Sequence, residues 1–208
     1  MPDPFSPDFF ARPTLEVAED LLGAWLVHDH PAGPLLRGRI VETEAYTQDD
    51  PAFHGWGLYD EETGRLAEEG RGIELFGPPG EAYVYLIYGM YWLLNVVTEP
   101  EGTGGAVLIR AVAPDLSSES VRAFMQKRRA AANEDADFTN GPGKLTQAFD
   151  IGERHHGRML TTPPLYLAAS PEREEALEYP VATSARIGIS KGTRRPWRFF
   201  YDGHPFVS

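Results

Sequence analysis

The segment from Arg39 to Tyr46 constrains the fold of this chain most, because strand-forming residues and two carboxylates alternate along it. It reads Arg-Ile-Val-Glu-Thr-Glu-Ala-Tyr. Side chains alternate between the two faces of a strand, so Glu42, Glu44 and Tyr46 should project together. Ile40 has the same spacing and should share that face. The simpler interpretation is an edge strand with a solvated polar face, and the alternative is a site that joins a carboxylate to an aromatic ring.

Two further segments supply groups that suit such a site. Residues 83–92 are rich in tyrosine, and a break at their centre predicts a β-hairpin with Tyr88 or Met90 at its tip. Residues 106–112 form an apolar strand that contains Arg110, which must find an anion if it is buried. A carboxylate, an aromatic wall and an arginine could hold a flat ring and activate water beside it.

Length and composition bound the class of protein. The chain has 208 residues, 42% of them hydrophobic, and no internal repeat or low-complexity linker divides it, so we expect a single domain over residues 1–208. No apolar run is long enough to span a bilayer, and there is no cysteine for disulfides or thiolate metal sites. We therefore expect a soluble, monomeric, cytoplasmic protein, nucleoid-associated if it is bacterial.

The formal net charge of −12 argues against broad affinity for nucleic acids, because phosphate contacts need lysine and arginine. The charge is unevenly distributed along the chain. Residues 181–201 contain five basic residues and no acidic one, and residues 122–129 contain four basic residues. Ordinary solvated charges are the simpler interpretation of these groups. The alternative is a local basic face on an acidic body.

The remaining segments predict helices and further strands. Helical spacing and caps indicate helices over 15–22, with Thr14 as N-cap, and 118–132. Strands are expected at 24–28, 185–190 and 194–201. His28 and His30 precede a Pro-Ala-Gly-Pro turn, which favours a polar turn over a metal site.

Residues 140–146 invite comparison with a phosphate-binding loop and do not match it. The first glycine of the G-x-x-x-x-G-K-[ST] pattern would fall on Phe138, and Leu145 replaces the required Ser or Thr. A helix that starts near Pro142 would still direct free backbone N–H groups and Lys144 towards an anion.

Several motifs, in their order along the chain, resemble the alkyladenine (3-methylpurine) DNA glycosylase family. They are Arg39-Ile-Val-Glu-Thr-Glu-Ala-Tyr46, Tyr83-Val-Tyr-Leu-Ile-Tyr-Gly-Met-Tyr91, Asn95, Val107-Leu-Ile-Arg110 and Gly141-Pro-Gly-Lys-Leu145. The resemblance spans nearly the whole chain. It implies an α+β fold, with one domain built on a curved, mainly antiparallel β-sheet flanked by helices. It also implies excision of damaged purines from double-stranded DNA without a metal or organic cofactor.

The resemblance further implies roles for individual residues. Glu44 would be the general base for the attacking water, which Arg110 would help to hold. Tyr88 would wedge into the gap left by the flipped nucleotide, with Met90 nearby. Four residues would line the pocket around the flipped base, the last of them screening out the amino group of normal guanine: Tyr46, His54, Tyr85 and Asn95.

Contacts with the DNA backbone are expected from basic residues, namely Arg71, Lys144, Arg186 and Arg195. The family commonly carries Thr-x-Arg-Asn before the tyrosine-rich strand, and only Arg71 of that element is kept here, because Glu69 and Gly72 take the other places. Cationic bases such as 3-methyladenine and 7-methylguanine leave readily. A neutral base such as hypoxanthine would need a proton donor that the sequence does not identify. No lysine stands beside Glu44, which predicts hydrolysis to an abasic site without strand cleavage.

Two other functions fit the same residues. Glu42 and Glu44 could form the carboxylate pair of a hydrolase for free nucleosides or small glycosides. Alternatively, Tyr83, Tyr85 and Tyr91 could stack bases in a noncatalytic reader of damaged DNA. Only an enzyme that opens a duplex needs a wedge such as Tyr88, which favours the glycosylase.

Overall fold

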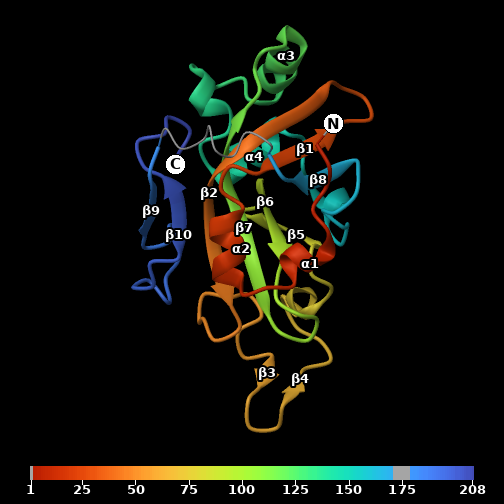
Figure 1. Ribbon diagram of the computed structural model, residues 1–208, viewed down its shortest axis with the longest axis vertical. Helices are drawn as coiled ribbons and strands as arrows, with labels where there is room; N and C mark the ends of the chain where they lie inside the picture. Colours follow the sequence, from red (N-terminus) through yellow and green to blue (C-terminus); the bar gives the residue numbers. More distant parts are fainter. Residues whose placement is uncertain (1, 171–178) are drawn as a thin grey trace.

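The computed structural model describes residues 2–170 and 179–208, and Figure 1 shows their arrangement. An eight-stranded sheet forms the centre of the molecule, with strand order β5-β6-β7-β2-β1-β8, and β10 joins β2 to β9. Every pairing in it is antiparallel. Its strands are β1 (Trp25–Asp29), β2 (Leu35–Thr47), β5 (Ala82–Ile87), β6 (Tyr91–Val97), β7 (Gly105–Pro114), β8 (Leu165–Ala168), β9 (Val181–Ser184) and β10 (Arg198–Tyr201). This architecture confirms the expected α+β fold.

Helices and one small hairpin surround the sheet. The α-helices are α1 (Pro7–Phe10), α2 (Thr14–Asp20), α3 (Glu119–Arg128) and α4 (Pro142–Ala148), and the 3-10 helices are η1 (Ile73–Phe76), η2 (Asp135–Phe138) and η3 (Glu153–His155). The hairpin consists of β3 (Tyr59–Asp60) and β4 (Arg65–Leu66). Figure 1 shows α3 and this hairpin at opposite ends of the long axis. The hydrophobic core lies between the helices and the sheet, where the side chains of Val17, Ala18 and Leu21 are fully buried.

Strand β2 lies inside the sheet, which overturns the edge-strand interpretation. One side of β2 pairs with β7 along most of its length. The other side pairs with β1 over Leu35 to Arg39 and then with β10 over Glu42 to Glu44. Between these two partners the pairing with β7 shifts register twice, first at a bulge where β2 has the extra residue Val41 and then where β7 has the extra residue Arg110. Because a bulge bends its strand and increases the twist, β2 can leave β1 and meet β10.

The bulge also sets which side chains share a face. Thr43 donates a 2.8 Å hydrogen bond to the carbonyl of Ala18 in α2, so Thr43 faces that helix. Because faces alternate along a strand, Glu42 and Glu44 point to the opposite side of the sheet. The register shifts separate Ile40 from this pattern, and Ile40 is fully buried in the hydrophobic core. The simple alternation therefore begins at Glu42, two residues later than expected.

Other expectations need correction. Helix α2 starts at Thr14 itself, whose backbone N–H and hydroxyl both donate to Glu99, so this side chain is an anchor to the segment after β6 and not a cap. The strand expected at 185–190 lies earlier, as β9, and the chain between β9 and β10 has no regular structure. His28 is buried within β1, and the turn begins only after His30.

Candidate active site

The register of four strands places chemically distinct residues in one row across the sheet. Tyr83 pairs with Asn95, Asn95 with Leu108, and Leu108 with Glu44. Residues directly opposite one another on neighbouring strands share a face, so this row lies on the side of the sheet away from α2. Long-range pairing has therefore assembled the site from β5, β6, β7 and β2.

A cavity of about 570 Å³ opens over this row. That volume lies in the range of about 300–1,000 Å³ that is typical of small-molecule sites. Loops before β3, before η1 and before β10 complete its walls. Its lining includes all four residues expected around a base, which are Tyr46, His54, Tyr85 and Asn95. It also includes one residue from each of the other expected groups, namely Arg110, Tyr88 and Arg71.

Glu44 lies directly behind this cavity and is fully buried. Its Oε2 accepts a 2.6 Å hydrogen bond from the Tyr46 hydroxyl, and its Oε1 accepts a 2.7 Å hydrogen bond from the Ile187 backbone N–H. Arg110 Nη1 lies 3.2 Å from the same Oε1. These three neighbours all line the cavity, whereas Glu44 itself does not. A carboxylate can accept about four hydrogen bonds, so these three donors leave one acceptor position of Glu44 unfilled.

Glu42 has a different environment although it lies only two residues away. Its Oε1 accepts hydrogen bonds from Arg110, Arg198 and the Ser208 hydroxyl, and its Oε2 accepts one from the Ser208 backbone N–H. Burial alone would raise the pKa of Glu42, but the charge of Arg110 and these hydrogen bonds lower it. Glu42 is therefore a buried anion whose acceptor positions are occupied.

Arg110 connects the two carboxylates. Its Nε donates a 2.7 Å hydrogen bond to Glu42, while its Nη1 faces Glu44. Burial would lower the pKa of Arg110, but the charges of Glu44 and Glu42 raise it, so the guanidinium stays protonated. Its Nη2 donates a 2.9 Å hydrogen bond to the Ser208 hydroxyl, so all three nitrogens of the planar guanidinium have protein partners at the edge of the cavity that Arg110 lines.

Aromatic rings form the walls above the carboxylate. The His54 and Tyr85 ring centroids lie 4.4 Å apart, and those of Tyr83 and Tyr85 lie 5.4 Å apart. Burial is the main cause that raises the pKa of Tyr85 to about 12, and it also raises the pKa values of Tyr83 and Tyr46. The phenols are therefore neutral near pH 7 and offer polarisable ring faces to a flat ligand.

The β5–β6 hairpin presents Tyr88 and Met90 at its tip, as expected. Tyr88 has φ 51° and Gly89 has φ 67°, and the turn is closed by a hydrogen bond from the Met90 N–H to the Ile87 carbonyl. Residues with positive φ at both central positions suit a tight hairpin turn, but a bulky residue there is uncommon. The Tyr88 side chain is 85% exposed and still borders the cavity. Turn geometry thus holds a large ring in solvent beside the pocket.

Asn95 completes the floor of the cavity. Its Nδ2 donates a 3.1 Å hydrogen bond to the backbone carbonyl of Tyr83, which fixes the orientation of the amide. The Asn95 Oδ1 is then the atom that can meet a ligand, because Asn95 lines the cavity. Asn95 thus contributes a carbonyl acceptor to the lining of the cavity.

Arg186 requires a correction. Its side chain is fully buried, its Nη1 donates to the Asp50 carboxylate and, at 2.8 Å, to the Ala45 carbonyl, and its guanidinium lies 4.4 Å from the Tyr46 ring centroid. A side chain without solvent exposure cannot contact phosphates on a surface. Arg186 instead supports the strand that carries Glu44 and Tyr46.

The other three basic residues are partly exposed. Arg195 stacks on Trp197 and pairs with Asp49 at 3.1 Å, and Lys144 donates to Asn140 at 2.7 Å. Arg71 lies at the cavity wall, where its Nη2 is 3.3 Å from His54 Nε2. Arg71 therefore lies at the wall of the cavity and not only at the outer surface.

Sequence analysis missed the residues that hold the carboxylates in place. Ile187 contributes through its backbone N–H, for which no side-chain pattern gives a signal. Arg198 and Ser208 bind Glu42, and only their alignment beside β2 makes them part of the site. Within residues 2–170 and 179–208, three or more His, Cys, Asp or Glu side chains nowhere gather as a metal-binding group. No helix in the same part of the chain could span a membrane.

A buried carboxylate thus lies behind a ring-lined cavity with a tyrosine exposed at its rim, an arrangement that suits a flat ligand. A sequence model of the methylpurine-DNA glycosylase family matches residues 8–205. The chain belongs to this family, as its motifs predicted. It is accordingly a hydrolytic DNA glycosylase of the 3-methyladenine type, with DNA as its substrate.

Relatives support this assignment over nearly the full chain, each carrying the provisional name 3-methyladenine DNA glycosylase. A protein of Salinibacter ruber is 52% identical, and the match covers 99% of this chain and 97% of the relative. A protein of Chlorobaculum tepidum is 42% identical, with 97% and 88% covered. A protein of Bacillus cereus is also 42% identical, with 97% of both chains covered.

Proposed function

We propose that this chain flips alkylated or deaminated purines out of duplex DNA and hydrolyses the N-glycosidic bond with a water molecule activated by Glu44. The expected lesions are 3-methyladenine, 7-methylguanine, hypoxanthine and ethenoadenine, and the product is an abasic site. The observation that carries the proposal is the position of the Glu44 carboxylate. It lies behind the cavity, held by Tyr46, Ile187 and Arg110, and keeps one acceptor position for water.

Access to the damaged base requires it to leave the duplex. The target bond is unreachable inside the stacked helix, so the nucleotide must rotate outward at a cost of a few kcal/mol. Tyr88 supports this step, because its ring is exposed at the hairpin tip and borders the cavity. Inserted between base pairs, the ring would restore the stacking that the flipped nucleotide loses, and Met90 would lie beside it.

The aromatic walls suit a purine that is already activated. Methylation at N3 or N7 makes the base cationic, and a cation over a tyrosine face gains about 0.5–2 kcal/mol. Tyr46, Tyr83 and Tyr85 are neutral phenols that can supply such faces. Because a cationic base leaves without further protonation, its excision needs only binding, orientation and an activated nucleophile.

Glu44 serves two purposes as the glycosidic bond breaks. Positive charge develops on the sugar, and a nearby carboxylate stabilises it while taking a proton from the attacking water. Arg110, held by Glu42, would fix the water or the developing charge from the other side. Among residues 2–170 and 179–208 no lysine contacts Glu44, which supports water and not an amine as the nucleophile. The proposed reaction therefore stops at base release.

The environment of Glu42 argues against a hydrolase that uses two carboxylates. Such enzymes need one carboxyl group as an acid or nucleophile that reaches the substrate. Glu42 is fully buried and is occupied by donors from Arg110, Arg198 and Ser208. The noncatalytic reader is also disfavoured, because Tyr91 packs near Gly143 and does not line the cavity with the other tyrosines.

The test is base release from duplexes that carry one lesion each, chosen from the four named above. Glu44→Gln should slow release about 10²–10⁴-fold while lesion binding persists. The substitution suits the fold, because a glutamine Oε1 can accept from Ile187 while its amide donates to the Tyr46 oxygen. Glu61→Gln, on the exposed β3–β4 hairpin, is the matched control for lost charge. Retained excision by Glu44→Gln would refute the mechanism. If the unmodified chain released no base from any duplex, the noncatalytic reader of damaged DNA would be the remaining function.

A further inference from the structure

The loop before η1 places Arg71 beside His54. Its neighbour Gly72 packs so closely on the His54 backbone that a larger residue would not fit. Gly72 has φ 84°, and a Cβ atom added to it would lie 2.8 Å from the backbone carbon of His54. Arg71, the residue before Gly72, lies at the cavity wall, where its Nη2 is 3.3 Å from His54 Nε2. The contact is part of a packed loop and not the chance position of a free side chain.

This contact determines the hydrogen bonds of His54. A guanidinium can only donate, so His54 Nε2 must accept and the ring proton must lie on Nδ1. His54 Nδ1 then donates to the Tyr83 hydroxyl, 3.1 Å away. Burial, and after it the charge of Arg71, lowers the pKa of His54 to about 4, so the ring is neutral near pH 7. With both nitrogens engaged, His54 offers a ligand its ring face.

The Asn95 amide nitrogen and the Arg110 guanidinium of the cavity lining also have protein partners. The Asn95 amide nitrogen donates to the Tyr83 carbonyl, and the charge of Arg110 is balanced by Glu42 and Glu44. Among the residues that the structure describes, Arg71 forms no salt bridge, although Glu74 lies close enough to influence the same tyrosine. The charge of Arg71 also acts on Tyr83 and Tyr85, where it opposes the effect of burial. Arg71 is thus the uncompensated cation of the lining.

We propose that Arg71 determines lesion preference by favouring neutral purines with an acceptor edge, such as hypoxanthine, over cationic alkylated purines. Its N–H groups can donate to lone pairs on the purine edge, and such charge-assisted hydrogen bonds are stronger than neutral ones. The same charge repels a base that is itself cationic, which weakens the attraction of the tyrosine walls for it. This inference rests on the proposed function and specifies how one residue selects among its substrates.

The test compares single-turnover excision of 7-methylguanine and hypoxanthine from otherwise identical duplexes. Arg71→Gln removes the charge and keeps an N–H donor for His54 Nε2. Its ratio of 7-methylguanine to hypoxanthine excision should rise about two- to fivefold, as expected for loss of one solvent-exposed charge interaction. Arg71→Lys keeps the charge and should stay within about twofold of the unmodified ratio. Arg65→Gln, in the exposed β4 strand, controls for the change in net charge.

The outcomes separate the inference from the proposed function. An unchanged or lower ratio in Arg71→Gln, with both lesions still excised, would overturn the inference alone. If Arg71→Gln excised both lesions equally more slowly and its DNA binding depended less on salt, Arg71 would be a phosphate contact. That result would also overturn the inference. Failure of the unmodified chain to excise either lesion would refute the proposed function itself.

Discussion

The hydroxyl of Tyr46 donates a 2.6 Å hydrogen bond to Glu44, two residues earlier on the same strand. Residues at this spacing share a face of β2, so a local pattern brings the two side chains together. The Tyr46 ring lines the cavity, while Arg186 lies 4.4 Å from its centroid. One residue therefore forms the wall of the pocket and orients the carboxylate behind it.

Removing this hydroxyl should affect both stability and catalysis. Tyr46→Phe keeps the ring but leaves Glu44 with one donor fewer. We expect the free energy of unfolding to fall by about 1–3 kcal/mol, the usual effect of losing a hydrogen bond to a charged group. Base excision should slow about tenfold if about 1.4 kcal/mol of this loss appears in the transition state. Urea unfolding and single-turnover excision measure the two effects, with Tyr59→Phe as control. If Tyr46→Phe left both the free energy of unfolding and the excision rate unchanged, the hydrogen bond would be dispensable.

The hairpin tip can be tested without disturbing its turn. Tyr88→Asn removes the ring, and asparagine tolerates the left-handed conformation that Tyr88 adopts at φ 51°. Thermal stability should stay the same or rise by a few tenths of a kcal/mol. Excision from a duplex should fall at least about tenfold, because a few kcal/mol of unstacking is no longer offset. Loss of the same size on a single-stranded substrate would contradict the role of Tyr88 as a wedge.

Arg186 should behave as a structural residue. Arg186→Met leaves the buried Asp50 carboxylate without its partner, which should lower the free energy of unfolding by about 3–5 kcal/mol. The salt dependence of DNA binding should not change, because no phosphate contact is lost. Denaturant titration and binding at several salt concentrations separate these effects. Arg194→Met, on the exposed neighbouring surface, is the control. If the dependence of DNA binding on salt became shallower in Arg186→Met, Arg186 would have to contact a phosphate, contrary to its burial.

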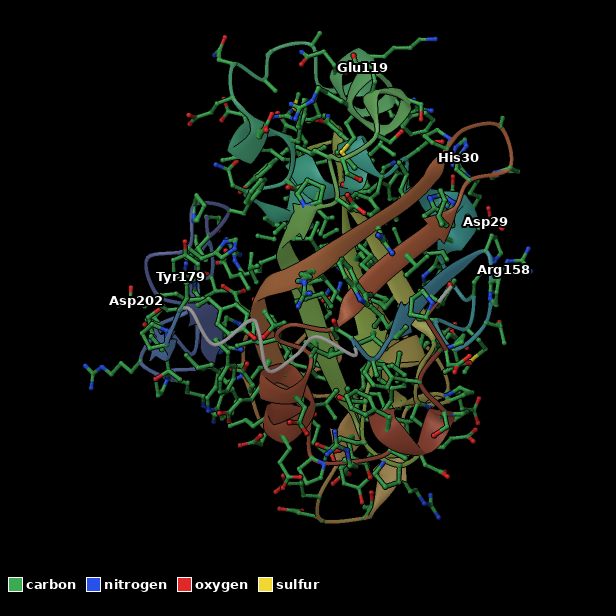
Figure 2. The ribbon with its side chains drawn as sticks, turned by 45° about the horizontal axis from the view of Figure 1, so that its top comes forward. Asp29, His30, Glu119, Arg158, Tyr179 and Asp202 are labelled. Atoms are coloured by element: carbon green, nitrogen blue, oxygen red, sulfur yellow. The ribbon has the colours of Figure 1, made fainter. Side chains whose placement is uncertain are left out.

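The fold should lose stability in mild acid because of buried histidines far from the cavity. His155 and His30 each lie 5.1 Å from His28, measured between ring centroids, and Figure 2 shows His30 on the flank opposite Tyr179 and Asp202. Burial is the main cause that lowers the pKa of His155 to about 4 and also lowers that of His28. The unfolded chain protonates these side chains near pH 6.5, whereas the folded chain protonates His155 only near pH 4 and His28 only below the usual range of a histidine. Stability is therefore complete above pH 6.5 and declines as the pH falls towards 4.

Replacement of one histidine tests this explanation. Between pH 7.5 and 5, His155 alone should remove about 1–2 kcal/mol from the free energy of unfolding. His155→Gln keeps an acceptor for the Gly152 N–H, which His155 Nδ1 binds at 3.1 Å, and removes the titration. Urea unfolding at both pH values should show a smaller decline in this variant. An identical decline would assign the acid sensitivity to other groups.

The amino-acid sequence by itself determined the family, the fold class and the local elements of the site. Alternation along β2 placed Glu42, Glu44 and Tyr46 on one face, and the Tyr88-Gly89 break located the hairpin tip. These features depend on neighbouring residues, so local conformational preferences are enough to predict them. The order of the motifs then identified the family, because the segments that resemble the family follow one another along the chain in the family's order.

Only the tertiary structure decided how the two carboxylates differ and where the basic residues lie. The Ile187 N–H that binds Glu44 is 143 positions away along the chain, and the Ser208 groups that bind Glu42 are 166 positions away. Burial of Arg186 and the pairing of β2 with β7, β1 and β10 likewise depend on distant segments. Local patterns carry no signal for such contacts, because the strand register and packing that create them arise only when the whole chain has folded.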